Sequence, residues 1–574
     1  MKNLAQRIVI LGGKHLPAVT LTVLLILGLL DAWAGRRSYA AGDTVSYMDM
    51  ASGIAGGDFS YAINGHFSPL YPIILSAFIW PFQSDSLIEF CAVRAINFLI
   101  FVSVILLFRV FLSRFLDQYY RQFESPKNLP PISRSQFTLV SYIIFAWGCF
   151  GLTMVSRVNP DMCVMGTTLA AAAMLLSFKE GHVSRMRFLA FGAMLGIGYL
   201  FKAIFFPVSF IFLAAAALEP NIRAVKLRLS LSLVAFLVIA SPLITALSIK
   251  YGHLTYGESG KLSYWTEVLQ QNRGRPSYVH WQGDPPGSGN PEHPTRKIFQ
   301  DPDVYEFASP IVSTYPPWFG TTYWNAGAVI RFDARKQVLA IVHNLEKLIK
   351  VLWLLLPLTG LLVAYRCRVS GSSLWYFRPL WLVGIANVGI YLLVVIDGRY
   401  LAGCLPILAI LTLAAVRIPN PARNFGAALA GLLAICVTVQ CGPRLAKAAS
   451  VLVRTHGEVR DERWIVADEF KRLGIKAGTT VAAIDYQQGY QYWPPALISD
   501  WARLARVRIV SEVVQTSDDG TQFWQASPDR QALALQAIRE TGARIVVANG
   551  VPEGAATAGW TQIQSSRYYY QLLQ

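Results

Sequence analysis

Charged residues are scarce in this sequence, at 15% of its 574 residues, whereas a soluble globular protein carries nearer a quarter. Acidic residues are the scarcer sign, with 34 Asp and Glu against 51 Lys and Arg. The composition therefore argues against a large soluble enzyme. Hydrophobic residues make up 54% and aromatic residues 12% of the chain, which excludes a disordered polar chain. Together these values predict that much of the protein is one membrane-embedded body.

Cysteines are few and scattered. None of the seven forms a CxxC pair, and none has the Cys/His spacing of a zinc site. They lie in or beside apolar segments, where a free cysteine acts as a small hydrophobic residue. The sequence therefore indicates neither a disulfide framework nor a metal cluster.

Apolar runs long enough for membrane-spanning helices, which need about 20 residues, recur along the chain. We predict eleven spans, at 16–34, 87–112, 136–156, 161–178, 187–201, 203–218, 229–249, 346–365, 379–396, 401–416 and 424–441. A shorter apolar run at 69–82 contains three prolines and suits a helix at the membrane interface better than a crossing helix. The first run leads straight into polar sequence and is interpreted as a span, not a cleaved signal peptide.

The distribution of positive charge sets the orientation. With 69–82 at the interface, one set of short loops carries most of the Lys and Arg, and the opposite short loops carry only Arg36, Arg37, Arg157, Lys202 and Arg399. Short cytoplasmic loops are the ones enriched in Lys and Arg, so we predict a cytoplasmic N-terminus and an external C-terminus. The net charge of +17 is thus explained by topology, and nucleic-acid binding is not indicated.

Three polar pieces are predicted on the external face: loops at 35–86 and 250–345, and a tail at 445–574. The expected domains are a transmembrane domain, 1–444, and a soluble external α/β domain, 445–574. Hydrophobic patterning in the tail predicts helices at 464–473 and 530–541 and strands at 480–485, 508–513 and 543–548. The stretch 487–495 is rich in Tyr, Trp and Gln and suits either a sugar site or a surface loop.

The ionisable residues collect at the external ends of the predicted spans. In the first external loop, Asp43 precedes a predicted short helix with an apolar stripe at Tyr47, Met50, Ala51 and Ile54. Asp49 points to another face and is expected to be solvated or structurally paired. The loop continues through Gly56-Gly57-Asp58 to Ser68-Pro69-Leu70-Tyr71-Pro72. This distribution favours an enzyme that acts on a lipid-borne substrate at the outer membrane boundary.

This order of motifs resembles the GT-C superfamily of polytopic glycosyltransferases, which includes protein O-mannosyltransferases, lipid A aminoarabinose transferase and lipopolysaccharide-core transferases. Arg94 at the start of the next span and the Asn159-Pro160-Asp161 element of the second external loop are similar to that family's layout. The resemblance covers about residues 16–440 in architecture. It implies transfer of a sugar from a polyprenyl-phosphate donor to an acceptor hydroxyl, usually with inversion.

The resemblance also implies roles for particular residues. Asp43 matches the family's catalytic carboxylate, which accepts the proton of the acceptor hydroxyl; an N-cap or packing role is the alternative. Arg94, Arg157, Lys202 and Arg399 are candidates for stabilising the leaving phosphate. Snorkelling to the interface is the alternative for Lys202, and pairing with a carboxylate is the alternative for Arg94 and Arg157.

The resemblance further implies that Asp161 binds the acceptor or orients the donor, with an N-cap role as the alternative. His66 is a lone candidate in the first loop. No cofactor is called for, although family members differ in their need for a divalent metal. In the long loop at 250–345, many aromatic residues predict an ordered cap over the acceptor cleft, with plain loop packing as the alternative. Its candidate polar residues are His280, Asp284 and His293.

The resemblance therefore implies a bacterial glycosyltransferase of the inner membrane, with the C-terminal domain in the periplasm. Its expected partners are a polyprenyl-phosphate sugar and a lipid, glycan or protein acceptor. A transporter or flippase of a lipid-linked saccharide is the first alternative, and it predicts charges inside the spans and internal repeats. A non-catalytic envelope-assembly protein is the second.

Overall fold

The computed structural model describes most of the chain in fifteen segments. They are residues 2–35, 43–82, 86–123, 132–179, 184–219, 226–269, 295–307, 314–315, 330–353, 356–417, 425–455, 462–485, 499–514, 522–555 and 557–573. The chain divides into two compact units, each built from three separate stretches. Unit 1 comprises 1–36, 94–256 and 334–457, and unit 2 comprises 37–93, 257–333 and 458–574.

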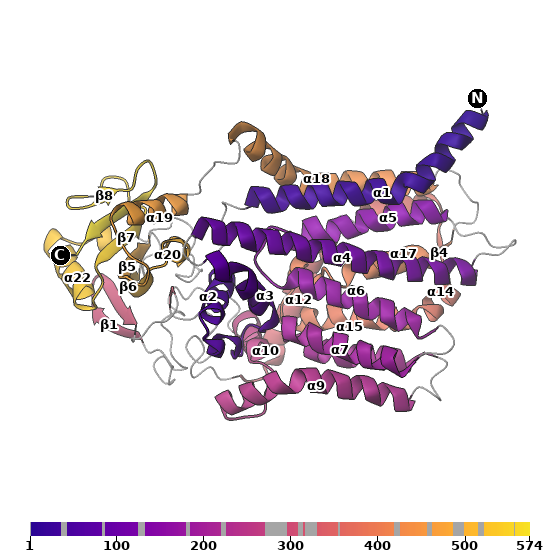
Figure 1. The fold of residues 1–574 in the computed structure, drawn as a ribbon, viewed down its shortest axis with the longest axis horizontal. Helices are drawn as coiled ribbons and strands as arrows, with labels where there is room; N and C mark the ends of the chain where they lie inside the picture. The colour runs from indigo at the N-terminus through magenta and orange to yellow at the C-terminus, as the bar shows by residue number, and fades with distance from the viewer. Residues whose placement is uncertain are drawn as a thin grey trace. The chain divides into compact units, whose positions relative to one another are not determined.

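Unit 1 is a bundle of helices. It contains α1 (Lys2–Ala34), most of α4 (Ser86–Phe123), α5 (Arg134–Ala146), η4 (Trp147–Thr153), α6 (Asp161–Ser177), α7 (Arg185–Phe201), α8 (Phe205–Ala217), α9 (Lys226–Tyr251), α12 (Ala334–Leu352), α13 (Leu356–Ala364), α14 (Gly371–Tyr376), α15 (Arg378–Val394), α16 (Gly398–Leu401), α17 (Leu405–Ala415) and α18 (Phe425–Thr455). Figure 1 shows α4, α5, α6, α7 and α9 as roughly parallel rods. A short pairing of β3 (Arg368–Val369) with β4 (Val416–Arg417) connects two of the helix termini.

Helices occupy all eleven segments predicted as spans. Among the described residues, four helices are long and apolar enough to cross a membrane, namely Ile88–Phe123, Arg134–Thr153, Arg228–Tyr251 and Phe425–Ser450. A fifth candidate is the pair α12 and α13, and several others are shorter apolar helices of 10–17 residues. These features make the chain a helical membrane protein, while the number of eleven crossings stays a prediction. The run at 69–82 forms α3 (Leu70–Ile79), whose ten residues rise only about 15 Å, half of a bilayer core.

The segment predicted as one span at 346–365 falls on the end of α12 and on α13 and stays a candidate span. The axes of these two helices differ by 67°. Pro357 lies in the first turn of α13, where its missing N–H cannot continue the hydrogen bonding of the helix before it. Likewise, the span predicted to end at residue 441 continues as α18 to Thr455, so the helix extends into the start of the predicted tail.

Small residues allow close helix packing in unit 1. A Cβ atom on Gly192 of α7 would lie 1.9 Å from the carbonyl oxygen of Ser232 in α9, so only glycine permits this approach. The Ser232 hydroxyl donates a hydrogen bond of 2.7 Å to the carbonyl of Phe188 across the same contact. Residues 185–201 therefore form a helix whose glycine-bearing face packs directly against a second backbone.

Unit 2 combines short helices with a seven-stranded sheet. Its N-terminal part contains α2 (Asp43–Ala55), η2 (Phe59–Ala62), α3, η3 (Trp80–Phe82) and the first turns of α4. Its C-terminal part contains α19 (Glu462–Arg472), β5 (Thr480–Asp485), α20 (Ser499–Ala505), β6 (Arg508–Val514), α21 (Gln522–Gln525), α22 (Pro528–Glu540), β7 (Ile545–Asn549), β8 (Thr561–Gln562) and β9 (Tyr568–Leu572). The five helices and strands predicted in the tail are confirmed, within a few residues at each end.

The sheet also recruits strands from the long loop. Its order is β1-β2-β6-β5-β7-β9-β8, where β1 (Thr295–Phe299) and β2 (Asp303–Phe307) come from the long loop predicted at 250–345. The same loop contributes α10 (Ser259–Tyr264) and η6 (Trp265–Leu269). The patterning of this loop did not predict β1 and β2, because two five-residue strands gain most of their stability from the neighbours that they pair with.

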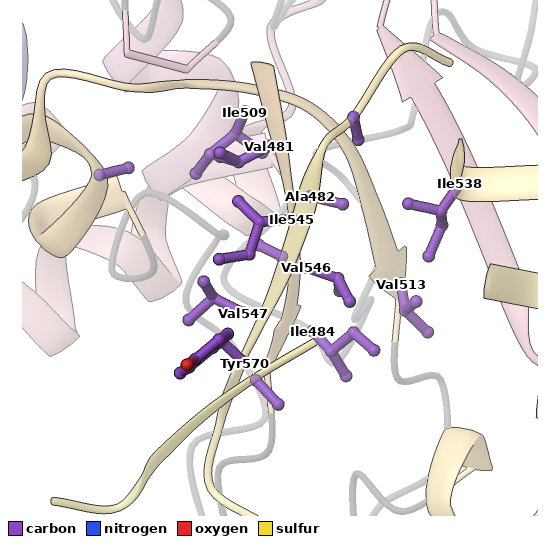
Figure 2. Packing of buried hydrophobic residues seen from close by; sticks show 14 of the residues in the cluster. Val481, Ala482, Ile484, Ile509, Val513, Ile538, Ile545, Val546, Val547 and Tyr570 are labelled. Carbon is purple, nitrogen blue, oxygen red and sulfur yellow. The ribbon is translucent and has the colours of Figure 1, made fainter. Parts of the chain in front are cut away.

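The core of the sheet lies around β5, β6 and β7. These three strands are parallel, whereas the outer strands are antiparallel. All five residues of β7 are buried. Figure 2 shows Ile545 and Val547 on one side of β7 and Val546 on the other. Burial on both faces explains why the central strands are nearly continuous runs of Val, Ile and Ala.

Candidate functional site

One cluster of ionisable residues in unit 1 is centred on Asp161. This carboxylate is the first residue of α6, and its side chain is only 2% exposed. Pro160 precedes it, and the Asp161 amide donates a hydrogen bond of 3.2 Å to the side chain of Asn159. A carboxylate at a helix N-terminus is favoured by the helix dipole. The Asn-Pro-Asp element therefore shapes a helix start and buries a negative charge there.

Lys202 supplies the first cation of the cluster. It follows α7 in an extended conformation, and its amide caps that helix by donating to the carbonyl of Gly198. Its Nζ lies 2.5 Å from Oδ1 of Asp161 and 4.0 Å from the centre of the Tyr400 ring. The Lys202 side chain remains 25% exposed. The tight turn between α7 and α8 thus holds an ammonium group against a buried carboxylate and an aromatic face.

Arg399 supplies the second cation. It lies in α16, whose N-cap is Asp397. Its Nε is 3.1 Å from Oδ2 of Asp397 and 3.8 Å from Oδ2 of Asp161, and its Nη2 is 3.2 Å from the hydroxyl oxygen of Tyr400. The Tyr400 ring stacks on Tyr391 with 5.3 Å between ring centres. The Asp397-Gly-Arg-Tyr400 motif therefore holds its guanidinium against α6.

The cluster is suited chemically to an anionic ligand. Lys202 and Arg399 place two cationic groups within 4 Å of the same carboxylate, that of Asp161. The carboxylate of Asp161 is buried, whereas that of Asp397 is 44% exposed. Fixed cations beside apolar helices stabilise developing negative charge strongly, because little reorganisation is needed. Three sequence candidates, Asp161, Lys202 and Arg399, are thus brought together.

The two other arginine candidates, Arg94 and Arg157, make different contacts. Arg94 is 3% exposed, and its guanidinium donates hydrogen bonds to the carbonyl oxygens of Gly35 and Ser156. It therefore links two backbone segments, and its role at the phosphate stays a prediction. The carbonyl of Arg157 accepts a hydrogen bond of 2.9 Å from Asn97, and no ion pair of its guanidinium occurs within the described segments.

Asp43 is the first residue of α2 in unit 2 and is half-buried. The predicted apolar stripe of α2 is confirmed, since Tyr47, Met50, Ala51 and Ile54 are all buried. Tyr47 packs on Phe67 at 4.6 Å and edge-on to Tyr71 at 5.3 Å between ring centres. These contacts fix α2 against the segment that leads into α3. Asp49 forms a structural ion pair, one of its two expected states.

His66 lies beside this packed segment. Its backbone amide donates to the side chain of Asn64, and its ring is edge-on to Phe67. Asn64 also accepts a hydrogen bond of 2.7 Å from the amide of Phe67, so it organises the whole turn.

His280, Asp284 and His293 lie outside the described residues, as does the stretch 487–495. Within the residues that the structure describes, no group of three or more His, Cys, Asp or Glu is arranged to hold a metal ion.

Two buried polar residues of unit 1, Asp31 and Asn344, were not among the predicted site residues. The carboxylate of Asp31 accepts hydrogen bonds from the amides of Val155 and Ser156 and lies 3.6 Å from Nε of Arg444. Asn344 of α12 is 2% exposed and bonds to the carbonyl of Leu392 and the amide of Ile396, one residue before Asp397. The sequence offered one signal for Asp31, a charged residue at the end of an apolar run. It offered no such signal for Asn344.

Comparisons with known proteins give distant structural similarities. No protein-family model matches the sequence, and no curated protein sequence matches it. The structure is similar to Cupriavidus metallidurans ArnT bound to undecaprenyl phosphate, with 12% identity, a TM-score of 0.47, and coverage of 96% of this chain and 97% of that one. Its similarity to apo ArnT has 14% identity and a TM-score of 0.48, with 96% and 98% coverage.

A third similarity is to the Archaeoglobus fulgidus oligosaccharyltransferase tethered to an acceptor peptide. It has 11% identity and a TM-score of 0.42, and it covers 93% of this chain and 69% of that one. Identities this low leave the chemistry of the chain to be inferred from its own residues.

Proposed function

We propose that the protein is an inverting glycosyltransferase that moves a sugar from a polyprenyl-phosphate donor to an acceptor hydroxyl. The observation that carries this proposal is the cluster of Lys202 and Arg399 around the buried Asp161. Cations held at the ends of apolar helices suit a phosphate whose hydrocarbon tail lies in the bilayer. The proposed location is the external, periplasmic face of a bacterial inner membrane.

In the proposed reaction, the acceptor oxygen attacks the anomeric carbon of the sugar as its proton passes to the carboxylate of Asp43. The bond between the anomeric carbon and the phosphate oxygen breaks, and polyprenyl phosphate leaves with one more negative charge. A single displacement of this kind inverts the anomeric centre. The hydroxyl is a weak nucleophile, so a positioned base contributes about 10²–10⁴-fold to the rate.

Lys202 and Arg399 are proposed to bind the leaving phosphate. Asp161 then orients the two cations, and Tyr400 supports both through its ring and its hydroxyl. Arg157 and Arg94 are further proposed phosphate ligands, and the guanidinium of Arg94 also donates to the carbonyl of Ser156. His66, His280, Asp284 and His293 are proposed to contact the acceptor or the sugar. The acceptor is a lipid, glycan or protein hydroxyl.

The first experiment compares wild type with Asp43→Asn in the same detergent. Each protein is incubated with a panel of radiolabelled polyprenyl-phosphate sugars and membrane extract, and both sugar transfer and carrier release are measured. The matched control is Asp58→Asn. Asp58 lies in the same loop, is exposed, and caps η2 through an oxygen that asparagine retains.

We expect wild type and Asp58→Asn to transfer sugar, and folded Asp43→Asn to lose at least 100-fold in rate. Equal transfer by all three proteins would remove Asp43 from the chemistry and direct attention to Asp161. Absence of transfer together with flipping of a lipid-linked saccharide in vesicles would contradict the enzyme and favour a transporter. Loss of function only on removal of the tail would favour an assembly protein.

A further inference from the structure

We propose that Arg503 is a positioning residue for α2, and so for Asp43 at the first turn of that helix. This inference rests on the proposed function, because it concerns the geometry of the proposed base. Arg503 lies in α20, in the C-terminal part of unit 2, and is 4% exposed. Its guanidinium joins α20 of the tail to α2 and α4 of the N-terminal stretch through Ser52 and Glu89. Figure 1 labels both α20 and α2.

The first step is the contact between Arg503 and α2. Its Nε lies 3.1 Å from Oδ1 of Asp49, and its Nη2 donates hydrogen bonds of 2.7 Å to the Ser52 hydroxyl and 3.4 Å to the Met48 carbonyl. These three partners occupy one side of α2. The contacts therefore restrain the rotation of α2 about its axis as well as its distance from α20.

The second step is the shared anchor at Glu89. This carboxylate is fully buried at the start of α4 and lies 2.6 Å from Nη2 of Arg503 and 3.0 Å from Nη2 of Arg506. The Ser52 hydroxyl also donates to Glu89 at 3.3 Å. Two arginines of the tail thus hold one carboxylate of the N-terminal stretch, and α2 is tied to the same point.

The long loop completes the network. The backbone amide and hydroxyl of Thr314 both donate hydrogen bonds to Asp49, at 3.1 and 2.8 Å. Thr314 is joined in turn to the sheet, since its carbonyl accepts a bond from the amide of Ile509 in β6. All three stretches of unit 2 therefore converge on the side of α2 that carries Asp49.

The chemistry of the network explains why it suits positioning. Two carboxylates, Asp49 and Glu89, balance two guanidinium groups, Arg503 and Arg506, in a buried setting. Hydrogen bonds to charged groups are strong and directional, whereas apolar packing alone would leave α2 freer to rotate. A general base must be held within hydrogen-bond reach of its substrate, and small displacements reduce rates sharply. The tail is thereby assigned a role in catalysis that involves no contact with substrate.

The test uses the full-length protein with Arg503→Lys and Arg503→Met. Lysine retains the charge but has one nitrogen, which cannot reach Asp49, Ser52 and Glu89 together. The matched control is Arg296→Lys, the same change in an exposed ion pair of β1, where Nη2 lies 2.7 Å from Glu306. The readouts are kcat, KM for the donor, and hydrogen exchange of the peptide that covers 43–55.

We expect Arg503→Lys to stay folded, to lose at least tenfold in kcat with donor KM within twofold of wild type, and to exchange faster in 43–55. The control should match wild type in all three. An unchanged kcat in a folded Arg503→Lys would overturn the proposal, and so would an equal fall for both variants and the control. If wild type transfers no sugar, the proposed function fails, and unchanged exchange in 43–55 then overturns the role of Arg503 separately.

Discussion

The ammonium of Lys202 lies 2.5 Å from the carboxylate of Asp161, although 41 residues separate them in the sequence. The pair joins the turn between α7 and α8 to the first residue of α6. Because Asp161 is buried and Lys202 is partly exposed, the carboxylate orients the cation while leaving it accessible. This relationship decides how the cluster responds to substitution.

Two substitutions of Lys202 should distinguish the effect of its charge on sugar transfer from the effect of its geometry. Lys202→Met leaves Asp161 buried with one fewer cation, so we expect sugar transfer to fall by about 100-fold, in line with the loss of one preorganised donor. Lys202→Arg keeps the charge and should retain roughly a tenth of the wild-type rate. The measurement is kcat/KM for the polyprenyl-phosphate donor. Equal rates for wild type and Lys202→Met would remove Lys202 from phosphate binding.

Asn344 should matter for the placement of Arg399. Its side chain donates to the Leu392 carbonyl and accepts from the Ile396 amide, so Asn344→Ala leaves two polar backbone groups unpaired. Each such group costs about 1–3 kcal/mol, and we expect a roughly tenfold lower kcat/KM from displacement of the Arg399 segment. Gln337→Ala is the matched control, because Gln337 lies on the same helix and donates to the adjacent Leu393 carbonyl from a more exposed site. Similar losses in both variants would contradict the prediction.

A buried ion pair and an exposed one should differ in their contribution to stability. Asp31→Ala removes the acceptor of two buried amides and leaves Arg444 without its carboxylate, so we expect a loss of about 3 kcal/mol. Asp117→Asn disrupts an exposed pair with Arg134 and should change stability by less than about 1 kcal/mol. Thermal unfolding in detergent distinguishes the two. A larger loss for Asp117→Asn would contradict this ranking.

The pH dependence of stability should show the effect of burying Lys179 and Glu219. Their side chains are 13% and 4% exposed, and 3.8 Å separates Nζ from Oε1. Burial lowers the pKa of Lys179 to about 8 and raises the pKa of Glu219 to about 7. Burial therefore outweighs the attraction between the two groups, and both neutral forms are favoured in the folded state.

The sign follows from proton binding. As pH falls from 7 towards 4.5, the folded state binds a proton at Glu219 more readily than the unfolded state, so folding is stabilised. As pH rises from 8 towards 10.5, the folded state releases the Lys179 proton more readily, which also stabilises folding. The contribution of the pair is thus least favourable between about pH 7 and 8.

The double variant Lys179→Met/Glu219→Gln tests this conclusion. Relative to wild type, it should gain most stability between pH 7 and 8, by about 1 kcal/mol, and the gain should shrink towards pH 5 and pH 10. The measurement is the difference in melting temperature across this range. Each single variant serves as a control, and a double variant that is least stable relative to wild type at pH 7–8 would contradict the prediction.

Much of the helical framework was predictable because helix hydrogen bonds are local and apolar runs follow directly from composition. The segments 161–178, 187–201 and 203–218 are helices within a residue or two of their predicted limits. Strands β5, β6 and β7 were predictable for a related reason, since burial on both faces leaves uninterrupted apolar runs. Strands β1 and β2 were not, because they are short and depend on pairing with each other and, through β2, with β6.

The sequence by itself determined where helices and central strands form, and it indicated Asp43, Asp161, Lys202 and Arg399 as charges at the ends of apolar runs. Only the tertiary structure decided which charges pair: Asp161 with Lys202 and Arg399, and Glu89 with Arg503. The last pair joins residues 414 positions apart. Local patterning cannot predict such pairs, because they exist only where packing removes the two groups from water and brings them into contact.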